Sequence, residues 1–217
     1  MRGCLRKREG GKAGKNETFI TADDKISRKR TGEQKMEMTD AARAVLDTIR
    51  NRRSMRSFKS GMIPEDVLDL ILEAGTWAPT GKGLQSPVIV VLTKEDDRRS
   101  FSRLNARYSH NRAEGFDPFY GAPVYALVLA DSSSSNWLRD GSCVLENMMI
   151  AAEALGIGSC WINREEEVFD SVEGKELLKK WGLDAGKIRG VGALALGYAG
   201  RAPGRAAPRK KDYIIKV

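Results

Sequence analysis

The chain has 217 residues and a mass of 24.0 kDa, with 41% hydrophobic and 30% charged residues. A chain of this size can bury one sizeable core, and the composition is typical of a globular protein that folds in water. No apolar run approaches the roughly 20 residues that a membrane-spanning helix needs, so we predict no membrane partner. We expect one globular domain with an extension.

The formal charge of +8 is concentrated near the N-terminus. Residues 1–35 hold 11 Lys and Arg against 5 Asp and Glu, which leaves 26 against 24 for residues 36–217. Because an enzyme that acts on nucleic acid more often carries its basic face on the folded domain, we predict no nucleic-acid partner. The Gly-rich basic segment lacks hydrophobic spacing, so we expect a disordered leader at 1–38 and a folded domain at 39–217. The sequence leaves open whether this leader is a real tail, a translation artefact or a cloning remnant.

Cysteine and histidine are sparse in this chain. Cys4, Cys143 and Cys160 lie far apart, which predicts neither a disulfide framework nor a metal site. The single histidine, His110, argues against a histidine-based metal centre. Residues 1–35 also lack the apolar central region of a secretory signal. We therefore expect reduced thiols and a cytoplasmic protein.

The first half of the domain is expected to form three helices and one strand. Thr39 is a typical N-cap, and Pro79 ends the second helix because proline disrupts a helix interior. The apolar run at 88–92 predicts a strand covered on both faces. The expected elements are a helix from 39 to 50, a helix from 64 to before Pro79, a Gly-rich loop over 78–87, a helix that opens at Thr93, and a loop or lid over 105–120.

The second half is expected to contain the remaining core strands. The pattern over 137–155 predicts the longest helix, and its apolar residues surround much of its circumference, so it should be central. Asn163, with Glu166 three residues on, is expected to cap the next helix, whose apolar stripe continues over 168–181. The expected strands are 124–130, 158–162 and 191–198, followed by a strand-like end at 212–217.

Three segments that are remote in sequence share one chemical character. The stretch Arg52-Arg53-Ser54-Met55-Arg56 places three guanidiniums and a hydroxyl within five residues, which makes a compact anion receptor. Gly and amide donors follow at 80–85, and basic residues at 205–211. Together they could grip a phosphate at one end and a polar heterocycle at the other. Neither GxGxxG nor the phosphate-loop motif GxxxxGK[ST] occurs in the chain.

The chain resembles the FMN-dependent nitroreductase family over residues 42–211. The motifs that carry the resemblance keep the family's order and spacing: RRSMRSF at 52–58, WAPTGKGLQSP at 77–87, DPFYGAPV at 117–124, ENMMIAAEALGIGSCWIN at 146–163 and GALALGYAGRAP at 192–203.

The resemblance implies an α+β fold with a mixed central β-sheet flanked by helices, in an intertwined homodimer with FMN at the subunit interface. It also implies an NAD(P)H-dependent oxidoreductase that passes two electrons to nitroaromatics, quinones or similar acceptors by a ping-pong mechanism. In such an enzyme the flavin carries the hydride chemistry, and the protein supplies binding, orientation and electrostatics. No catalytic side chain is therefore expected.

The resemblance implies two groups of phosphate or flavin contacts among the basic residues. Positive charge near the flavin pyrimidine would stabilise the anion of reduced flavin and so favour hydride acceptance. The sequence does not divide phosphate and ring contacts among the arginines. The first contact set is Arg52, Arg53, Ser54 and Arg56, and the family's late phosphate-binding position is matched by Arg209 and Lys210.

The resemblance places two further segments near the flavin. Asn163 and Arg164 fall where family members offer backbone groups near flavin N5, the atom that accepts hydride. Gly83 stands where the family commonly has asparagine, so we expect one polar flavin contact to be missing and acceptor choice to differ. The loop that approaches the partner subunit's flavin is expected to use Pro79, Thr80, Gly81 and Gln85, and the segment 105–120 is expected to shape the substrate opening.

Other functions remain open at this point. Within flavin chemistry, the alternative is a family member without nicotinamide-driven turnover, which modifies flavin or desaturates a bound substrate. The rival of another class is a non-catalytic module that stores flavin or, through the basic leader, binds nucleic acid.

Overall fold

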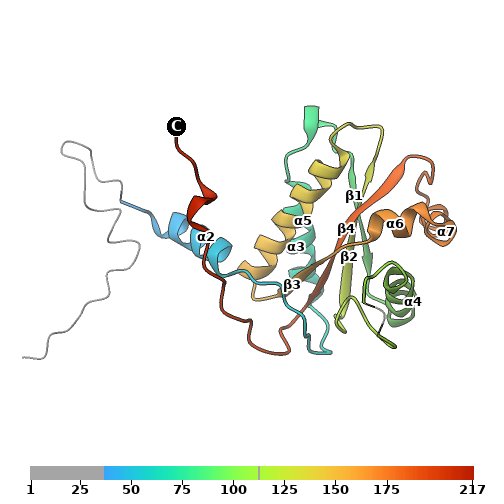
Figure 1. Cartoon of the computed structure of the whole chain (residues 1–217), viewed down its shortest axis with the longest axis horizontal. Coiled ribbons are helices and arrows are strands. Elements are labelled where there is room, and N and C mark those ends of the chain that lie inside the picture. Colours follow the sequence, from blue (N-terminus) through green and yellow to red (C-terminus); the bar gives the residue numbers. More distant parts are fainter. Residues whose placement is uncertain (1–36, 112) are drawn as a thin grey trace, which may run out of the picture. The chain divides into compact units, whose positions relative to one another are not determined.

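The computed structural model describes residues 37–111 and 113–217 (Figure 1). The chain divides after Thr39 into two units, and every element described below belongs to the unit 40–217. The leader expected at 1–38 lies almost wholly outside the described residues, so it stays a prediction. Over the described ranges, no helix has both the length and the apolar character needed to cross a bilayer.

The fold is built on a four-stranded antiparallel sheet in the order β1-β2-β4-β3. The strands are Pro87–Leu92 (β1), Val124–Asp131 (β2), Gly158–Ile162 (β3) and Ile188–Gly197 (β4). The expected α+β class is confirmed, but these four strands are antiparallel rather than mixed. The reason is visible in the register: Leu92 pairs with Tyr125, so the connection between β1 and β2 leaves and re-enters the sheet at the same end. A parallel pairing occurs only as an isolated bridge between Ser54 and Ser159 in the described part of the chain.

Helices cover both faces of this sheet. In Figure 1, α3 and α5 lie on one face, and α4, α6 and α7 lie on the other. The bounds are Asp40–Asn51 (α2), Glu65–Thr76 (α3), Glu95–Ala106 (α4), Trp137–Ala154 (α5), Glu165–Asp170 (α6) and Val172–Lys180 (α7), with short 3₁₀ turns at Gly81–Gly83 (η1) and Lys211–Tyr213 (η2).

Alternate residues of β2 enter two separate cores. Val124, Ala126 and Val128 pack in the core beneath α3 and α5, whereas Tyr125 and Leu127 pack in the core beneath α4, α6 and α7. Successive side chains of a strand point to opposite faces, so a strand covered on both faces has a continuous apolar sequence. The predicted strand at 124–130 and the predicted long helix at 137–155 are both confirmed.

Several predicted elements differ from those observed. β1 was expected to be covered on both faces, but it is an edge strand and residues 87–91 are only half-buried. The stripe over 168–181 is divided into α6 and α7, because the Ser171 hydroxyl accepts from Gly174 N–H and caps a new helix. Residues 212–217 join no strand ladder, and Asn105 belongs to the last turn of α4 rather than to a loop.

The backbones of β4 and α6 touch at Gly190. A Cβ atom added there would lie 2.1 Å from the carbonyl oxygen of Glu165, and backbone cannot move aside as a flexible side chain can. Glycine is therefore required by the packing of the helix against the sheet.

We predict that Gly190→Ala destabilises the fold by about 1–3 kcal/mol, the range of overpacked cores. The matched control is Gly61→Ala, where nothing lies within 4 Å of the added Cβ, and where we expect a change within about 0.5 kcal/mol. Urea unfolding of both variants measures the difference, and equal midpoints would contradict the close approach.

Candidate flavin site

The arginine-rich segment lies along the outer side of β3. Met55 N–H donates to the Ser159 carbonyl at 2.8 Å, and Ser54 forms the isolated bridge to the same residue. Met55 is buried, whereas Ser54 and Arg56 on either side of it are exposed. An extended segment alternates its side chains, so the buried methionine anchors a strip that presents its polar neighbours outward.

The three arginines of this segment differ in their partners. Arg53 Nη1 donates to the carbonyl oxygens of Arg50 at 2.7 Å and of Arg52 at 2.6 Å, so it satisfies carbonyls at the end of α2. The side chains of Arg52 and Arg56 make no hydrogen bond or ion pair with any residue that the structure describes. Two guanidiniums are therefore available to an anionic ligand, and Arg53 has a structural task.

Arg52 and Arg56 lie close enough to β3 to influence the pKa of the Cys160 thiol. Burial raises the pKa of this thiol, while the charges of Arg56 and Arg52 and a hydrogen bond with Ser54 oppose that rise. The thiol is almost fully buried, as is usual for a free cysteine that packs as a small apolar residue.

The end of β3 carries the next pair of predicted site residues. Asn163 is exposed directly after the strand, and Arg164 adopts a left-handed φ of 89° at the start of α6. Asn163 was expected to cap this helix, but Arg164 is the N-cap residue, and its side chain pairs with Glu167 at 2.8 Å. From Ser159 to Asn163 the strand covers roughly 13 Å, so the arginine strip and this turn lie along one edge of the sheet.

The Gly-rich loop is closed by its own polar groups. Gln85 N–H donates to the Thr80 hydroxyl at 3.1 Å, and Gly81 N–H donates to a carboxylate oxygen of Asp140 at 3.0 Å. Asp140 is buried in the first turn of α5, and sequence reasoning missed it. The available signal was an acidic residue in the first turn of the long helix. Pro79 directly precedes this closed turn.

Arg209 and Lys210 lie in the segment 201–217, which is exposed throughout. Their contacts are local: Arg209 donates to the Ala207 carbonyl at 2.9 Å, and Lys210 Nζ lies 5.4 Å from the Tyr213 ring centroid. No hydrogen bond or ion pair within the described ranges joins this segment to Arg52 or Arg56. A single subunit therefore does not bring the late basic residues into contact with the first set.

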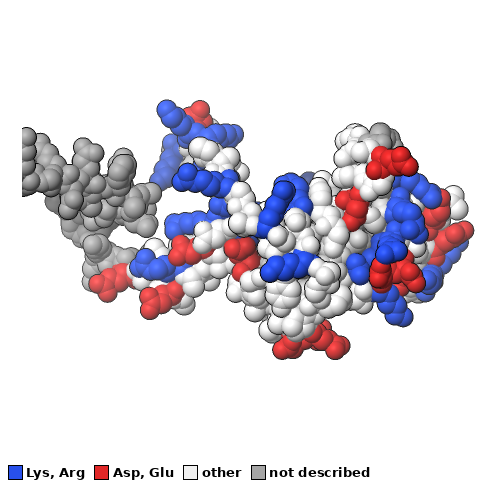
Figure 2. Space-filling view, turned by 90° about the horizontal axis from the view of Figure 1, so that it is seen from below, with Lys and Arg blue, Asp and Glu red and all other residues white. Residues whose placement is uncertain are grey.

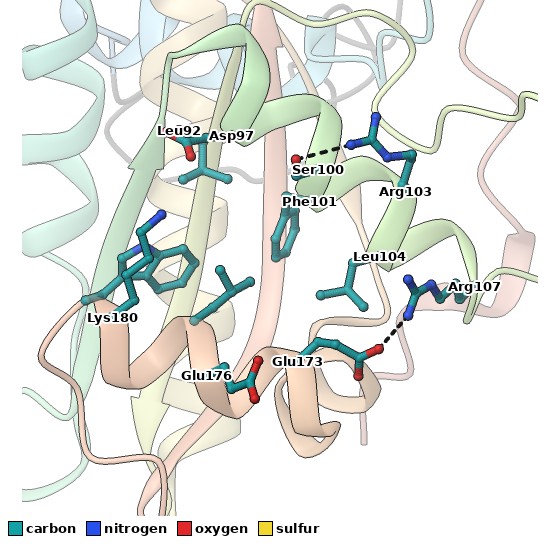
Figure 3. Close-up of a pocket in the computed structure, with 12 residues that line it drawn as sticks. Leu92, Asp97, Ser100, Phe101, Arg103, Leu104, Arg107, Glu173, Glu176 and Lys180 are labelled. Carbon is teal, nitrogen blue, oxygen red and sulfur yellow. Dashed lines mark hydrogen bonds and ion pairs between the residues drawn. The ribbon is translucent and has the colours of Figure 1, made fainter.

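The domain has several cavities, and those that border the predicted site residues lie beside the Gly-rich loop. The first, of ≈ 520 Å³, lies between α4 and α7 and contains none of the predicted site residues (Figure 3). Two of its lining residues, Arg107 and Glu173, form an ion pair at 2.6 Å. The second, of ≈ 360 Å³, lies beside α3 and β1 and is lined in part by Thr80 and Gln85. The Gly-rich loop therefore borders a cavity, whereas the arginine strip lines none of the cavities described above.

No cluster of three or more His, Cys, Asp or Glu side chains able to hold a metal occurs in the described residues.

The family model for the nitroreductase family matches residues 49–198. This chain belongs to the nitroreductase family. The matched range includes the arginine strip, the Gly-rich loop, the end of β3 and the whole sheet. The family suggested by the sequence motifs is thus confirmed.

Solved structures support the same assignment. A nitroreductase with bound FMN from Bacteroides fragilis is 30% identical, with a TM-score of 0.73 over 80% of this chain and 98% of that one. A nitroreductase with bound FMN from Desulfitobacterium hafniense is 25% identical, with a TM-score of 0.72 over the same shares.

Curated relatives are matched over part of their length. A relative from Methanothermobacter thermautotrophicus is 27% identical over 126 residues, which are 54% of this chain and 59% of that protein. An FMN reductase (NADPH) from Bacillus subtilis is 25% identical over 141 residues, which are 58% of this chain and 57% of that protein. The chain therefore spans less than two thirds of the length of these two relatives.

Substitution of Gly83 tests whether the Gly-rich loop can accommodate the asparagine that the family commonly has at this position. Its φ is +66°, and nothing lies within 4 Å of an added Cβ. Because asparagine tolerates the left-handed region, we predict that Gly83→Asn changes the free energy of unfolding by less than about 1 kcal/mol. Gly83→Val, with a branched side chain in the same conformation, should cost about 1–2 kcal/mol. Thermal unfolding compares the two, and a valine variant as stable as the asparagine variant would contradict the left-handed turn.

Proposed function

We propose that this chain is an FMN-dependent oxidoreductase that takes hydride from NAD(P)H and passes two electrons to nitroaromatic, quinone or similar acceptors. The observation that carries the proposal is the pair of arginines, Arg52 and Arg56, without ion-pair partners beside β3. Membership of the nitroreductase family and two solved relatives with bound FMN support the choice of ligand. NAD(P)H as co-substrate is supported by the name of the Bacillus subtilis relative.

The chemistry of the donor set fits FMN. The ribityl phosphate is a dianion that suits guanidinium donors, and Arg52, Arg56 and the exposed Ser54 hydroxyl supply such donors on one strip. The turn at Asn163 and Arg164 offers backbone groups further along the same edge. When bound, FMN would supply the hydride transfer itself.

The protein's own groups then have separate tasks. Between them, Arg52 and Arg56 would contact the phosphate and the pyrimidine end of the ring, where positive charge favours the reduced anion. Arg53 keeps the end of α2 in place through two carbonyl contacts. The turn at Asn163 and Arg164 would face the ring edge that accepts hydride. Alternate use of one surface by donor and acceptor is the ping-pong scheme that we propose.

The homodimer is supported by exposed apolar surface. No residue of α2 is buried, and Val45, Leu46 and Ile49 are each more than a third exposed. At the C-terminus, Ile214 and Ile215 are 75% and 80% exposed. Apolar patches of this kind mark interfaces, and a second copy of the chain would cover them. The same association would bring Arg209, Lys210 and the loop of Pro79, Thr80, Gly81 and Gln85 to a partner's flavin.

The remaining predictions concern partners and location. On the right of Figure 2, Lys and Arg are interspersed with Asp and Glu, so this face of the domain is not uniformly basic. The absence of a nucleic-acid partner stays a prediction. A cytoplasmic location and the absence of a membrane partner stay predictions.

The purified protein, after incubation with FMN and desalting, should retain yellow colour that bleaches on anaerobic addition of NADH or NADPH. Absorbance near 450 nm measures both properties in one cuvette. Retained flavin that does not bleach would favour a member without nicotinamide-driven turnover, and a colourless protein would contradict the proposal.

We further predict that Arg52→Ala and Arg56→Ala each weaken FMN binding by about 1.5–3 kcal/mol, as expected for a lost charge-assisted hydrogen bond. Fluorescence titration with FMN measures the dissociation constant. The matched control is Arg50→Ala, which removes the same charge from an exposed ion pair with Asp47. If all three variants bind FMN equally, the arginine strip is not the phosphate site.

A further inference from the structure

Glu165, the first residue of α6, is a fully buried carboxyl group without a cation partner. It has no exposed surface, and it forms no ion pair with any described residue. The neighbouring guanidinium of Arg164 pairs with Glu167 instead. A carboxylate in such a place is costly unless hydrogen bonds or a proton neutralise it.

The partner of this carboxyl group is Asn105 in the last turn of α4, which is also buried. Its Nδ2 donates to Glu165 Oε1 and to the Asn163 carbonyl oxygen, both at 3.0 Å. Because two acceptors face the same nitrogen, the network fixes the orientation of the amide.

The two remaining atoms of this pair, Asn105 Oδ1 and Glu165 Oε2, are buried and have no partner. Both are acceptors while the carboxylate is ionised, so neither can satisfy the other. A proton on Oε2 turns that atom into a donor, while Oδ1 of its hydrogen-bonded partner Asn105 is an acceptor that lacks a donor. Protonation can therefore satisfy both atoms with one hydrogen bond between them.

The electrostatic surroundings favour this proton. Burial raises the pKa of Glu165 to about 8, and the charge of Glu167 adds to the rise, while the residue's own backbone N–H and the charge of Arg164 oppose it. The hydrogen-bond partner from α4 is the uncharged Asn105 amide, and on the β4 side the uncharged Gly190 packs against the backbone and Cβ of Glu165. No charged side chain of α7 is among the groups that act on the carboxyl.

The Asn163 carbonyl links this pair to the flavin site. It belongs to the same peptide unit as Arg164 N–H, and in a trans peptide these two groups point in opposite directions. A carbonyl held inward by Asn105 therefore turns Arg164 N–H outward. That N–H donates to no residue that the structure describes.

We propose that protonated Glu165 and Asn105 form a positioning pair that holds the Asn163 carbonyl inward, so that Arg164 N–H faces the reactive edge of the flavin, and that ionisation of Glu165, which leaves Oε2 and Asn105 Oδ1 as two buried acceptors without a donor, weakens this hold. The proposal rests on the proposed function for the place of the flavin. The acid and amide pairing itself does not depend on it.

The pairing predicts a pH dependence of stability. The carboxyl titrates from an ordinary value of 4.5 in the unfolded chain to about 8 in the fold. Its stabilising contribution is therefore complete below pH 4.5 and is lost progressively as pH rises from 4.5 through 8. Glu165→Gln keeps both points of the pairing, since its amide can accept from and donate to Asn105, and it removes the titration.

The test compares FMN dissociation constants at pH 7 and pH 9 for the full chain, Glu165→Gln and the exposed neighbour control Glu166→Gln. If only the protonated form positions the turn, the unmodified protein and the control lose up to about tenfold in affinity at pH 9, and Glu165→Gln keeps its affinity. An equal loss in all three proteins overturns the positioning role.

A second measurement needs neither a variant nor FMN activity. NMR of the protein labelled with ¹³C at glutamate carboxyls should show one resonance that titrates above pH 7, and a set that titrates entirely below pH 6 overturns the pairing. If FMN binds none of the proteins while this resonance persists, the proposed function fails and the acid and amide pair stands.

Discussion

The burial of β2 and β4 between two layers of helices determines where the segments of the candidate site lie at the edge of the sheet. Their side chains alternate between two cores, so neither strand can slip by one residue without exposing an apolar set. β3 pairs with β4 and presents its other edge to the strip at 52–56. The hydrogen bond from Met55 to Ser159 then holds the arginines beside the turn at Asn163. Sheet packing thus dictates the position of the charged groups.

The site combines rigid support with unpaired charge. Arg53 and Asp140 contact backbone groups and stabilise the segments on which the proposed flavin contacts lie. Arg52 and Arg56 have no ion-pair partner among the described residues, and an anion would supply one. The exposed apolar surface of α2 and of the C-terminal segment supports the proposed homodimer, in which one subunit alone would hold an incomplete site. In such a dimer Arg209 and Lys210, which contact Ala207 and Tyr213 of their own segment, would be available to a partner's flavin.

Much of this arrangement could be predicted from the sequence, because the spacing of apolar residues indicates which face of a helix or strand is buried. The strand at 158–162 and the long helix at 137–155 followed from their apolar patterns, and the family followed from five short motifs. Pairing direction and edge position could not be predicted: β1 has the sequence of a covered strand but lies at the edge. Periodicity also could not reveal contacts between remote residues. Asn105 and Glu165 are 60 positions apart, and each belongs to a residue type that usually lies on the surface.

The most direct measurement is a crystal structure of the protein grown with FMN. We expect the phosphate within hydrogen-bond distance of Arg52 or Arg56, the ring beside Asn163 and Arg164, and a second copy of the chain that contributes Arg209 and the Gly-rich loop. FMN bound instead in the cavity between α4 and α7, or a ring on the opposite side of the sheet from the arginine strip, would contradict this account.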